Sequence, residues 1–97
     1  MLILITYDVS LKDETGSKRL RKIAEVCLDY GIRVQNSVFE CDVSSDQWCI
    51  LKAKLLDIYD ADVDSLGFYK LGKNGHNKVE HFGAKKAPDV FKSVLIL

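Results

Sequence analysis

The first nine residues, MLILITYDV, alternate in a way that predicts a buried β-strand. Successive side chains of a strand point to opposite faces. One face therefore carries Leu2, Leu4, Thr6 and Asp8, and the other carries Ile3, Ile5 and Tyr7. Both faces are mostly apolar, and a strand of this kind must be covered on both. Because a chain of 97 residues is expected to cover only one face, we expect a second copy of the chain to cover the other, with Asp8 near the seam.

Two helices are predicted from apolar positions at helical spacing. In residues 17–31, SKRLRKIAEVCLDYG, the positions i, i+3, i+4 and i+7 are Leu20, Ile23, Ala24 and Cys27. Gly31 stands where a helix C-cap is expected. The second helix is predicted to begin at Ser44 or Ser45, because Ser44 and Gln47 have the spacing of a capping box. Its apolar positions are Trp48, Leu51, Leu55 and Ile58.

Further extended segments complete the pattern. Residues 32–43, IRVQNSVFECDV, predict two short strands around a bend at residues 36–37. Residues 60–72, DADVDSLGFYKLG, predict the next strand, with Gly67 marking a bulge or the close approach of another group. The order strand, helix, strand, strand, helix, strand is that of the ferredoxin-like split βαβ arrangement. The sequence therefore predicts an α+β fold with one antiparallel sheet and both helices on one of its faces.

The chain is predicted to form a single domain, residues 1–97, since its length leaves no room for two. Residues 78–82, KVEHF, favour a short fifth strand. Residues 73–97 are expected to form a C-terminal strand and tail, which ends in the apolar residues 94–97. An apolar segment left unpaired is prone to aggregation, so we expect this tail to pack on the dimer partner.

Composition favours a soluble intracellular protein. The 14 basic and 14 acidic residues give a formal net charge of zero, so any attraction to nucleic acid must come from local patches. Cys27, Cys41 and Cys49 lack metal-site spacing and are expected to be reduced thiols packed as small hydrophobes. No apolar run approaches the roughly 18 residues that span a membrane, and the N-terminus lacks the basic segment of a signal peptide. We therefore expect a cytoplasmic protein with no membrane contact.

Asp8 is the leading candidate for chemistry. An aspartate at a strand end is commonly a turn former, and one alone makes a poor metal site, because Mg²⁺ usually takes one or two carboxylates together with water and phosphate oxygens. A two-fold dimer would bring Asp8 of both copies together, and two close carboxylates repel each other unless a proton or a cation lies between them. A divalent cation there could activate water and hold a phosphodiester. The turn former and the metal ligand remain alternatives on this reasoning.

Charged and aromatic residues are weaker candidates. Basic side chains gather at Lys18, Arg19, Arg21, Lys22 and Arg33, and more loosely at Lys70, Lys73, Lys78, Lys85, Lys86 and Lys92. Acidic side chains gather at Asp57, Asp60, Asp62 and Asp64. Such runs are usually solvated faces, although the separation of sign also suits contacts with nucleic-acid phosphates. Tyr7 and Phe39 are interpreted as core aromatics, and His76 and His81 as structural residues.

Three segments together resemble one protein family. They are LILITYDVS near the N-terminus, the basic helix SKRLRKIAEVCLDYG and, above all, GIRVQNSVFECDV at residues 31–43. They resemble the CRISPR-associated adaptation protein Cas-two, the small partner of the Cas-one integrase. The resemblance covers residues 1 to about 83. It implies a ferredoxin-like homodimer whose sheets face each other and whose terminal strands cross to the partner.

The resemblance also implies a function and a site. Family members are described as metal-dependent endonucleases that cut single-stranded RNA or double-stranded DNA. Their dimer bridges two Cas-one dimers while short foreign DNA is inserted into the CRISPR array. The implied catalytic residue and ligand for Mg²⁺ or Mn²⁺ is Asp8, shared with Asp8 of the partner. Tyr7, Arg33 and Phe39 match neighbours of the family's active site. The implied nucleic-acid contacts are Arg19, Arg21 and Arg33.

Other functions remain open on the residues alone. A non-catalytic scaffold would use the basic faces to touch the DNA backbone and the tail to hold a partner. An RNA-recognition module shares the order of elements, but VFECDV lacks the aromatic K/R-G-F/Y segment that such modules use for stacking. A small-ligand regulatory domain of the same fold would give Asp8 and the basic helix no role. The preferred interpretation is a dimeric CRISPR adaptation scaffold with metal-dependent nuclease activity.

Overall fold

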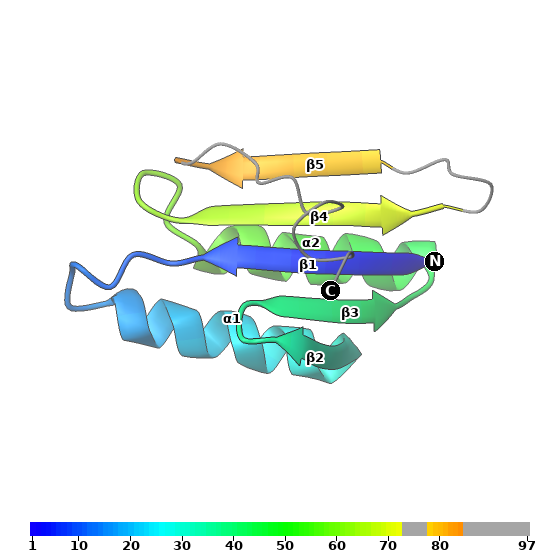
Figure 1. The fold of residues 1–97 in the computed structure, drawn as a ribbon, viewed down its shortest axis with the longest axis horizontal. Coiled ribbons are helices and arrows are strands. Elements are labelled where there is room, and N and C mark those ends of the chain that lie inside the picture. The colour runs from blue at the N-terminus through cyan, green and yellow to red at the C-terminus, as the bar shows by residue number, and fades with distance from the viewer. Residues whose placement is uncertain (73–77, 85–97) are drawn as a thin grey trace.

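The computed structural model describes residues 1–72 and 78–84 as one antiparallel sheet covered by two helices. The elements in chain order are β1 (Leu2–Asp8), α1 (Gly16–Tyr30), β2 (Gly31–Gln35), β3 (Val38–Asp42), α2 (Ser45–Ile58), β4 (Ser65–Leu71) and β5 (Lys78–Gly83). The strands lie in the order β2-β3-β1-β4-β5, so that β1 is central (Figure 1). Both helices lie on the same face of the sheet (Figure 1). The predicted ferredoxin-like α+β fold is confirmed.

The two faces of β1 contact different parts of the core. Ile3, Ile5 and Tyr7 point towards the helices and belong to the main hydrophobic cluster. The residues that the helices and neighbouring strands add to this cluster include Ile23, Cys27, Phe39, Trp48, Leu51, Leu55 and Phe68. On the opposite face, Leu4 forms a second buried cluster with its neighbours Val38 and Tyr69. We call the face of the sheet that points away from the helices the open face. It carries Leu2, Leu4, Thr6 and Asp8 together with their cross-strand partners. The predicted alternation is confirmed, and the second copy of the chain stays a prediction.

Helix α2 begins as its sequence predicts. The Ser44 side chain accepts a hydrogen bond from the backbone N–H of Gln47, and the Gln47 side chain accepts one from the backbone N–H of Ser44. This reciprocal capping box satisfies two backbone donors that the helix itself cannot pair. Trp48, Leu51 and Leu55 are buried as expected, whereas Ile58 is only partly buried.

Gly31 is the C-cap of α1, as predicted, and its backbone N–H donates to the carbonyl oxygen of Cys27. Its φ of −166° is extended, and the residue leads directly from α1 into β2. A Cβ at this position would lie 2.2 Å from the carbonyl oxygen of Glu40 and 2.6 Å from Sγ of Cys41. Glycine is required here by the close approach of β2 to β3 immediately after the helix.

Gly67 marks a close approach and not a bulge. The pairing of β1 with β4 runs without interruption from Leu2 opposite Leu71 to Asp8 opposite Ser65, with Thr6 opposite Gly67. A Cβ on Gly67 would lie 2.6 Å from Oγ1 of Thr6. The register shift in the sheet lies instead in β2, between residues 33 and 35.

The cysteines divide into two kinds. All three are free thiols. Cys27 and Cys41 are buried, and burial raises the pKa of Cys27 to about 12 and that of Cys41 to about 11, because a thiolate is poorly solvated in the core. Cys49 is exposed, so the expectation that all three pack as hydrophobes is wrong for this residue.

Some predictions lie outside the described residues. These are the packing of the tail beyond residue 84, and the placement of Lys73, His76, Lys85, Lys86 and Lys92. The predicted fifth strand lies within the described part and is confirmed as β5. In the part of the chain that the structure describes, no helix is long and apolar enough to cross a membrane.

Candidate metal site at the end of the first strand

Asp8 occupies the position that the sequence predicts. It is the last residue of β1, lies opposite Ser65 of β4, and is exposed. Because residues 2, 4, 6 and 8 share one face, its carboxylate belongs to the open face. Asp8 also lines a cavity of about 480 Å³ beside the end of the strand. The other lining residues are Val9, Ser10, Leu11, Lys12, Asp62, Val63 and Ala84.

The donor set of one chain suits a hard cation held mainly by water and phosphate. A carboxylate oxygen is the ligand type that Mg²⁺ and Mn²⁺ prefer. Within residues 1–72 and 78–84, however, no group of three His, Cys, Asp or Glu side chains could hold a metal ion. Since Mg²⁺ usually takes one or two carboxylates and fills its remaining positions with water and phosphate oxygens, Asp8 fits such a site as one of two carboxylates.

Tyr7, Arg33 and Phe39 gather on the other side of the sheet from Asp8. The rings of Tyr7 and Phe39 stack with centroids 6.0 Å apart, and the Arg33 guanidinium lies 5.1 Å from the Phe39 centroid. The Tyr7 hydroxyl donates to the carbonyl oxygen of Asn36 at 3.3 Å. Burial raises the pKa of Tyr7 against the opposing effect of Arg33, so the hydroxyl stays protonated at neutral pH. The three predicted neighbours therefore form one cluster, which is separated from the Asp8 carboxylate by the sheet.

Arg19 lies in an ion-pair network and not on a free surface. Its side chain is 11% exposed, and Nε donates to Oδ2 of Asp64 at 2.7 Å. Its Nη1 and Nη2 donate to the two carboxylate oxygens of Asp13, both at 3.1 Å, and Nη1 also donates to the hydroxyl of Thr15. A guanidinium whose donors are engaged in this way is poorly placed to bind a phosphate. This placement argues against the predicted role of Arg19 as a nucleic-acid contact.

Asp64 is the centre of this network. The residue is completely buried, yet both carboxylate oxygens are hydrogen bonded: Oδ1 accepts from the backbone N–H of Ser10 at 2.9 Å, and Oδ2 accepts from Arg19 and from the backbone N–H of Asp60. Burial alone would raise the pKa of Asp64, but these hydrogen bonds and the charge of Arg19 outweigh it and lower the pKa. Hydrogen bonds from Arg19 and Thr15 likewise hold the pKa of Asp13 well below its usual range.

These two lowered pKa values predict that the fold loses stability in acid. A carboxyl group whose pKa is lower in the folded than in the unfolded chain stabilises the fold above its unfolded pKa, about 4, and this contribution is lost as pH falls towards the folded value. We expect the melting temperature to fall between pH 5 and pH 2, and to fall less steeply for Asp13→Asn. Calorimetry across this range measures the effect, with Asp29→Asn, at the other end of α1, as the charge-matched control. Equal slopes for Asp13→Asn and the wild type would contradict the assignment.

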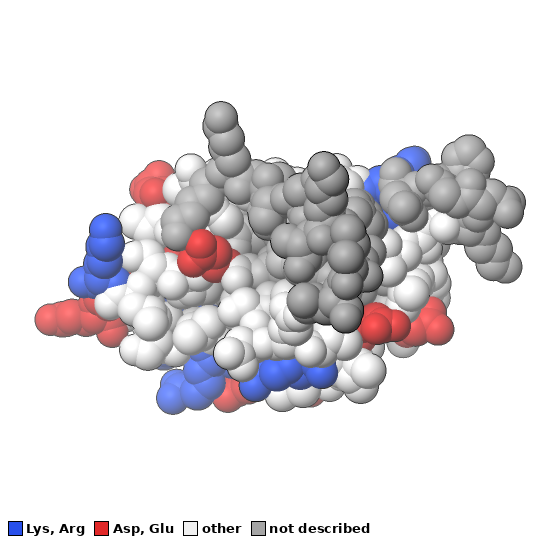
Figure 2. All heavy atoms as spheres, in the orientation of Figure 1, with Lys and Arg blue, Asp and Glu red and all other residues white. Residues whose placement is uncertain are grey.

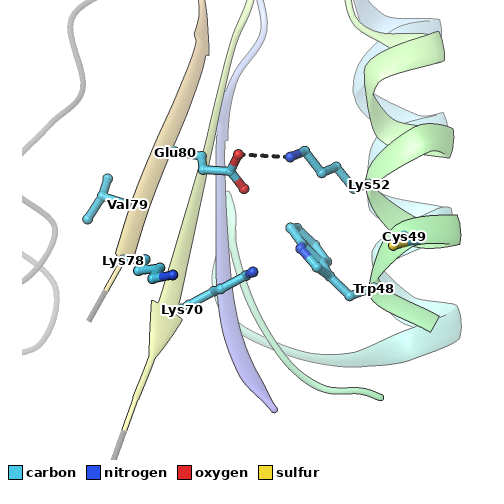
Figure 3. Close-up of a pocket in the computed structure, with 7 residues that line it drawn as sticks. All are labelled: Trp48, Cys49, Lys52, Lys70, Lys78, Val79 and Glu80. Carbon is cyan, nitrogen blue, oxygen red and sulfur yellow. Dashed lines mark hydrogen bonds and ion pairs between the residues drawn. The ribbon is translucent and has the colours of Figure 1, made fainter. Parts of the chain in front are cut away.

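Basic side chains that remain accessible among the described residues include several of α1, such as Lys18 and Lys22, Arg33 of β2, and a pair at the β4–β5 edge. Arg21 and Arg33 are exposed, and Arg21 has only a loose contact with Glu25, at 3.9 Å. A cavity of about 590 Å³ opens between α2 and the edge formed by β4 and β5 (Figure 3). There Lys52 pairs with Glu80 at 2.8 Å, while Lys70 and Lys78 stand directly opposite each other on the two strands.

The lysine pair in this cavity favours an anion. Neither Lys70 nor Lys78 forms an ion pair with the residues that the structure describes. Two like charges directly opposite each other on neighbouring strands destabilise the sheet unless an anion lies between them. On the open face, by contrast, the described surface in view is mostly white, with one acidic patch beside the grey residues and the other charged side chains towards the edges (Figure 2).

The family of the chain follows from its sequence matches. A family model described as "CRISPR associated protein Cas2" matches residues 1–79, which is most of the chain. The chain belongs to this family. The resemblance seen in LILITYDVS and GIRVQNSVFECDV is confirmed, and both segments lie within the matched residues.

Relatives and a solved structure agree with the Cas2 family. A "CRISPR-associated endoribonuclease Cas2" of Nitratidesulfovibrio vulgaris is 58% identical over 89 residues, which cover 92% of this chain and 87% of that protein. A "CRISPR-associated endonuclease Cas2" of Halalkalibacterium halodurans is 54% identical over 90 residues, covering 93% and 94%. The crystal structure of Streptococcus pyogenes Cas2 at pH 6.5 is 51% identical, with a TM-score of 0.70 over 76% of this chain and 89% of that one.

Asp64 is a residue of the site region that the sequence pattern does not single out. The pattern groups it with the acids of residues 57–64 as part of a solvated run, whereas the structure buries it completely. The predicted topology nevertheless indicates where Asp64 lies. Because β1 and β4 are antiparallel, the residue before Ser65 must lie beside the loop that follows Asp8. A buried acid at that point is a candidate partner of the loop.

Proposed function

We propose that this Cas2-family chain acts as a homodimeric, metal-dependent endonuclease on RNA or double-stranded DNA, with Asp8 of each copy at one shared site. The observation that carries the proposal is the position of Asp8, an exposed carboxylate at the end of the central strand and on the open face. The names of two relatives support the activity, since one is called an endoribonuclease and the other an endonuclease.

The open face supports the second copy. One row in register crosses all five strands, and its members are Ile32, Glu40, Leu4, Tyr69 and Val79. Four of the five are apolar or aromatic, and the outer two, Ile32 and Val79, remain 63% and 48% exposed. Two-fold packing of this face on itself would remove the exposed apolar area of Ile32 and Val79 from water, since Leu4 and Tyr69 are already buried in the single chain. With the two-fold axis near the end of β1, both copies contribute Asp8 to one site.

Different side chains hold the cation and the nucleic-acid substrate. Mg²⁺ or Mn²⁺, when bound, supplies Lewis-acid help by activating water and offsetting charge on the phosphodiester. The Asp8 carboxylates hold the cation at the seam. Arg21, Arg33 and the pair Lys70 and Lys78 are accessible cations that contact backbone phosphates, which positions a strand without selecting its sequence.

We further propose that the dimer bridges two integrase dimers during insertion of foreign DNA into the CRISPR array, in the cytoplasm. Membership of the Cas2 family supports this role. The helical layer also leaves large apolar side chains exposed, Leu28 of α1 and Ile50 of α2, which suit contact with another protein. This scaffold role does not need cleavage and can coexist with it.

A cleavage assay tests the proposed nuclease. Single-stranded RNA and duplex DNA are incubated with the protein and Mg²⁺, with and without EDTA, and the assay is repeated with Asp8→Asn. We expect EDTA to stop cleavage and Asp8→Asn to slow it by about a hundredfold or more, since even loss of a group that only supports a metal ligand costs 10–100-fold. Asp42→Asn is the matched control, because Asp42 is also an exposed acid at a strand end on the open face.

Each result decides between the two roles. Cleavage that survives in Asp8→Asn at the wild-type rate would exclude Asp8 as the metal ligand. A wild-type dimer that cleaves neither substrate with Mg²⁺ or Mn²⁺ would leave the scaffold as the function of the chain. Equal loss in Asp8→Asn and Asp42→Asn would point to a general effect of charge on the open face.

A further inference from the structure

Both backbone polar groups of Ser10 are held by one buried ion pair. Its N–H donates to Oδ1 of Asp64 at 2.9 Å, and its carbonyl oxygen accepts from Nη2 of Arg19 at 3.3 Å. The same Nη2 also donates to Oδ1 of Asp64 at 3.3 Å, which closes a small ring of three residues. Ser10 belongs to a loop, and loop backbone is usually bonded to water. Its attachment to a buried acid from a distant segment is therefore specific.

Ser10 lies two residues after Asp8, at the point where the chain leaves the sheet. The pairing of β1 with β4 ends at Asp8 opposite Ser65. Asp64 directly precedes Ser65, so its side chain continues the attachment of the two segments beyond the last pair of the ladder. Without it, the segment that follows Asp8 would be held before α1 begins at Gly16 by the packing of Val9 on the core and by the bonds of Asp13 to Arg19, but not at Ser10. Strand ends of this kind fray.

Two glycines show how closely the surrounding backbone is packed on this ring. A Cβ on Gly16 would lie 2.1 Å from the carbonyl oxygen of Ser10. Gly83, with φ of 118°, ends β5, and a Cβ there would lie 2.0 Å from the carbonyl oxygen of Asp64. The starts of α1 and β4 and the ends of β1 and β5 therefore lie close together around Asp64 and Ser10.

We propose that Asp64 is a positioning residue for Asp8: together with Arg19 it holds Ser10 and so fixes the direction in which the Asp8 carboxylate faces a divalent cation. This inference rests on the proposed function, because it assigns Asp64 a part in the same metal site. Asp64 itself is completely buried, and both of its carboxylate oxygens accept hydrogen bonds within the fold. It acts through the backbone of residues 8–10, as outer residues of metal sites orient the ligands themselves.

A gain in folding stability does not by itself explain why the charged side chain of Asp64 is buried here. Removing two charges from water costs about as much as their attraction returns, so a buried ion pair is often no more stabilising than apolar residues of the same size. What an ion pair with several directed hydrogen bonds supplies is a defined geometry. The geometry here converges on the residue that follows the metal ligand by two positions.

Asp64→Asn tests the inference, because it keeps the size of the side chain and removes its charge and one acceptor. Asp13→Asn is the matched control: it removes the other carboxylate bound to Arg19 but leaves both hydrogen bonds of Ser10 in place. Thermal unfolding shows that each variant is folded at the assay temperature. Amide hydrogen exchange at Ser10 and binding of Mn²⁺, followed by the electron paramagnetic resonance of the free ion, are then measured on the full-length dimer.

We expect Asp64→Asn to exchange the Ser10 amide at least tenfold faster and to bind Mn²⁺ at least fivefold more weakly, with Asp13→Asn close to wild type in both. In cleavage assays, Asp64→Asn should lower kcat and leave the KM for RNA nearly unchanged, since the phosphate contacts lie elsewhere. If Asp64→Asn does not fold, Arg19→Lys decides by the same measurements, because one ammonium cannot replace the guanidinium bonds to Asp64 and Ser10.

The outcomes separate this inference from the proposed function. Wild-type Mn²⁺ binding in a folded Asp64→Asn protein would overturn the positioning role, provided that Asp8→Asn abolishes that binding. Wild-type Mn²⁺ binding in Asp8→Asn would instead overturn the proposed site, and the positioning role with it. Equal weakening by Asp64→Asn and Asp13→Asn would assign the effect to the charge of the region and overturn the role of the Ser10 bonds.

Discussion

Replacing Phe68 by alanine is expected to lower the free energy of unfolding by about 3–5 kcal/mol, the cost typical of emptying a large aromatic site. Phe68 lies at the middle of β4 and is 1% exposed. Its ring meets Trp48 of α2 edge-on with centroids 4.9 Å apart, and the Phe82 ring of β5 at 5.7 Å. The side chain therefore joins the helical layer to two strands, and the surrounding backbone has little freedom to fill the space that it leaves.

Urea unfolding at one fixed protein concentration measures this loss, because the stability of a dimer depends on concentration. Phe68→Leu, which keeps most of the apolar volume, should cost clearly less than alanine. Phe82→Ala should also cost less, since Phe82 is only partly buried. A loss below about 1 kcal/mol for Phe68→Ala would mean that the core collapses into the cavity, contrary to the rigid packing of these rings.

Local patterns in the sequence were sufficient to predict the elements. The alternation of residues 2–8 depends only on the geometry of a strand, and the capping box of Ser44 and Gln47 depends only on residues three apart. Both are confirmed because each requires contacts within one segment or one face. The order of elements then restricts the topology to very few choices. This is why the fold and the position of Asp8 followed from sequence.

The site region was harder to predict because it depends on residues far apart in the chain. Arg19 and Asp64 are 45 positions apart and pair through the end of the sheet. Nothing in the helical pattern around Arg19 distinguishes it from the exposed Arg21. Gly31 shows that prediction from local pattern is also limited at short range. The position requires glycine because Glu40 of the neighbouring strand approaches it, and the sequence of the preceding helix does not reveal this. Tyr7 adjoins Asp8 in sequence, but strand geometry places them on opposite faces.

The separation of basic and acidic residues along the sequence is partly accounted for by these internal ion pairs. The sequence separates a basic helix from an acidic run, which is compatible with a surface made for nucleic acid. In the structure, Arg19 of the helix is paired with Asp64 of that run, and Lys52 is paired with Glu80. Some of the apparent separation of charge therefore holds the fold together. The accessible cations among the described residues include Lys18, Arg21 and Lys22 of α1, Arg33, and the lysine pair of the β4–β5 edge.

Combining Ile32→Lys with Val79→Lys is expected to convert the proposed homodimer into monomers and to abolish cleavage with it. Both residues belong to the row across the open face and are exposed in the single chain, so the substitutions leave its fold intact. In a face-to-face dimer, the four added ammonium groups would lose water and repel one another, which the Glu40 opposite position 32 offsets only in part. A hundredfold or greater rise in the dissociation constant, about 2.7 kcal/mol, is a modest expectation for that cost.

Light scattering and the cleavage assay, run on the same samples, test whether mass and activity fall together. Leu28→Lys combined with Ile50→Lys is the matched control, because it places the same charges at equally exposed apolar positions on the helical layer. Lysine is chosen over glutamate so that weaker attraction to nucleic acid cannot explain a loss of cleavage. A variant that remains dimeric would show that the open face is not the interface. Monomers that cleave at the wild-type rate would show that Asp8 does not need its counterpart, because each chain would then hold the cation alone.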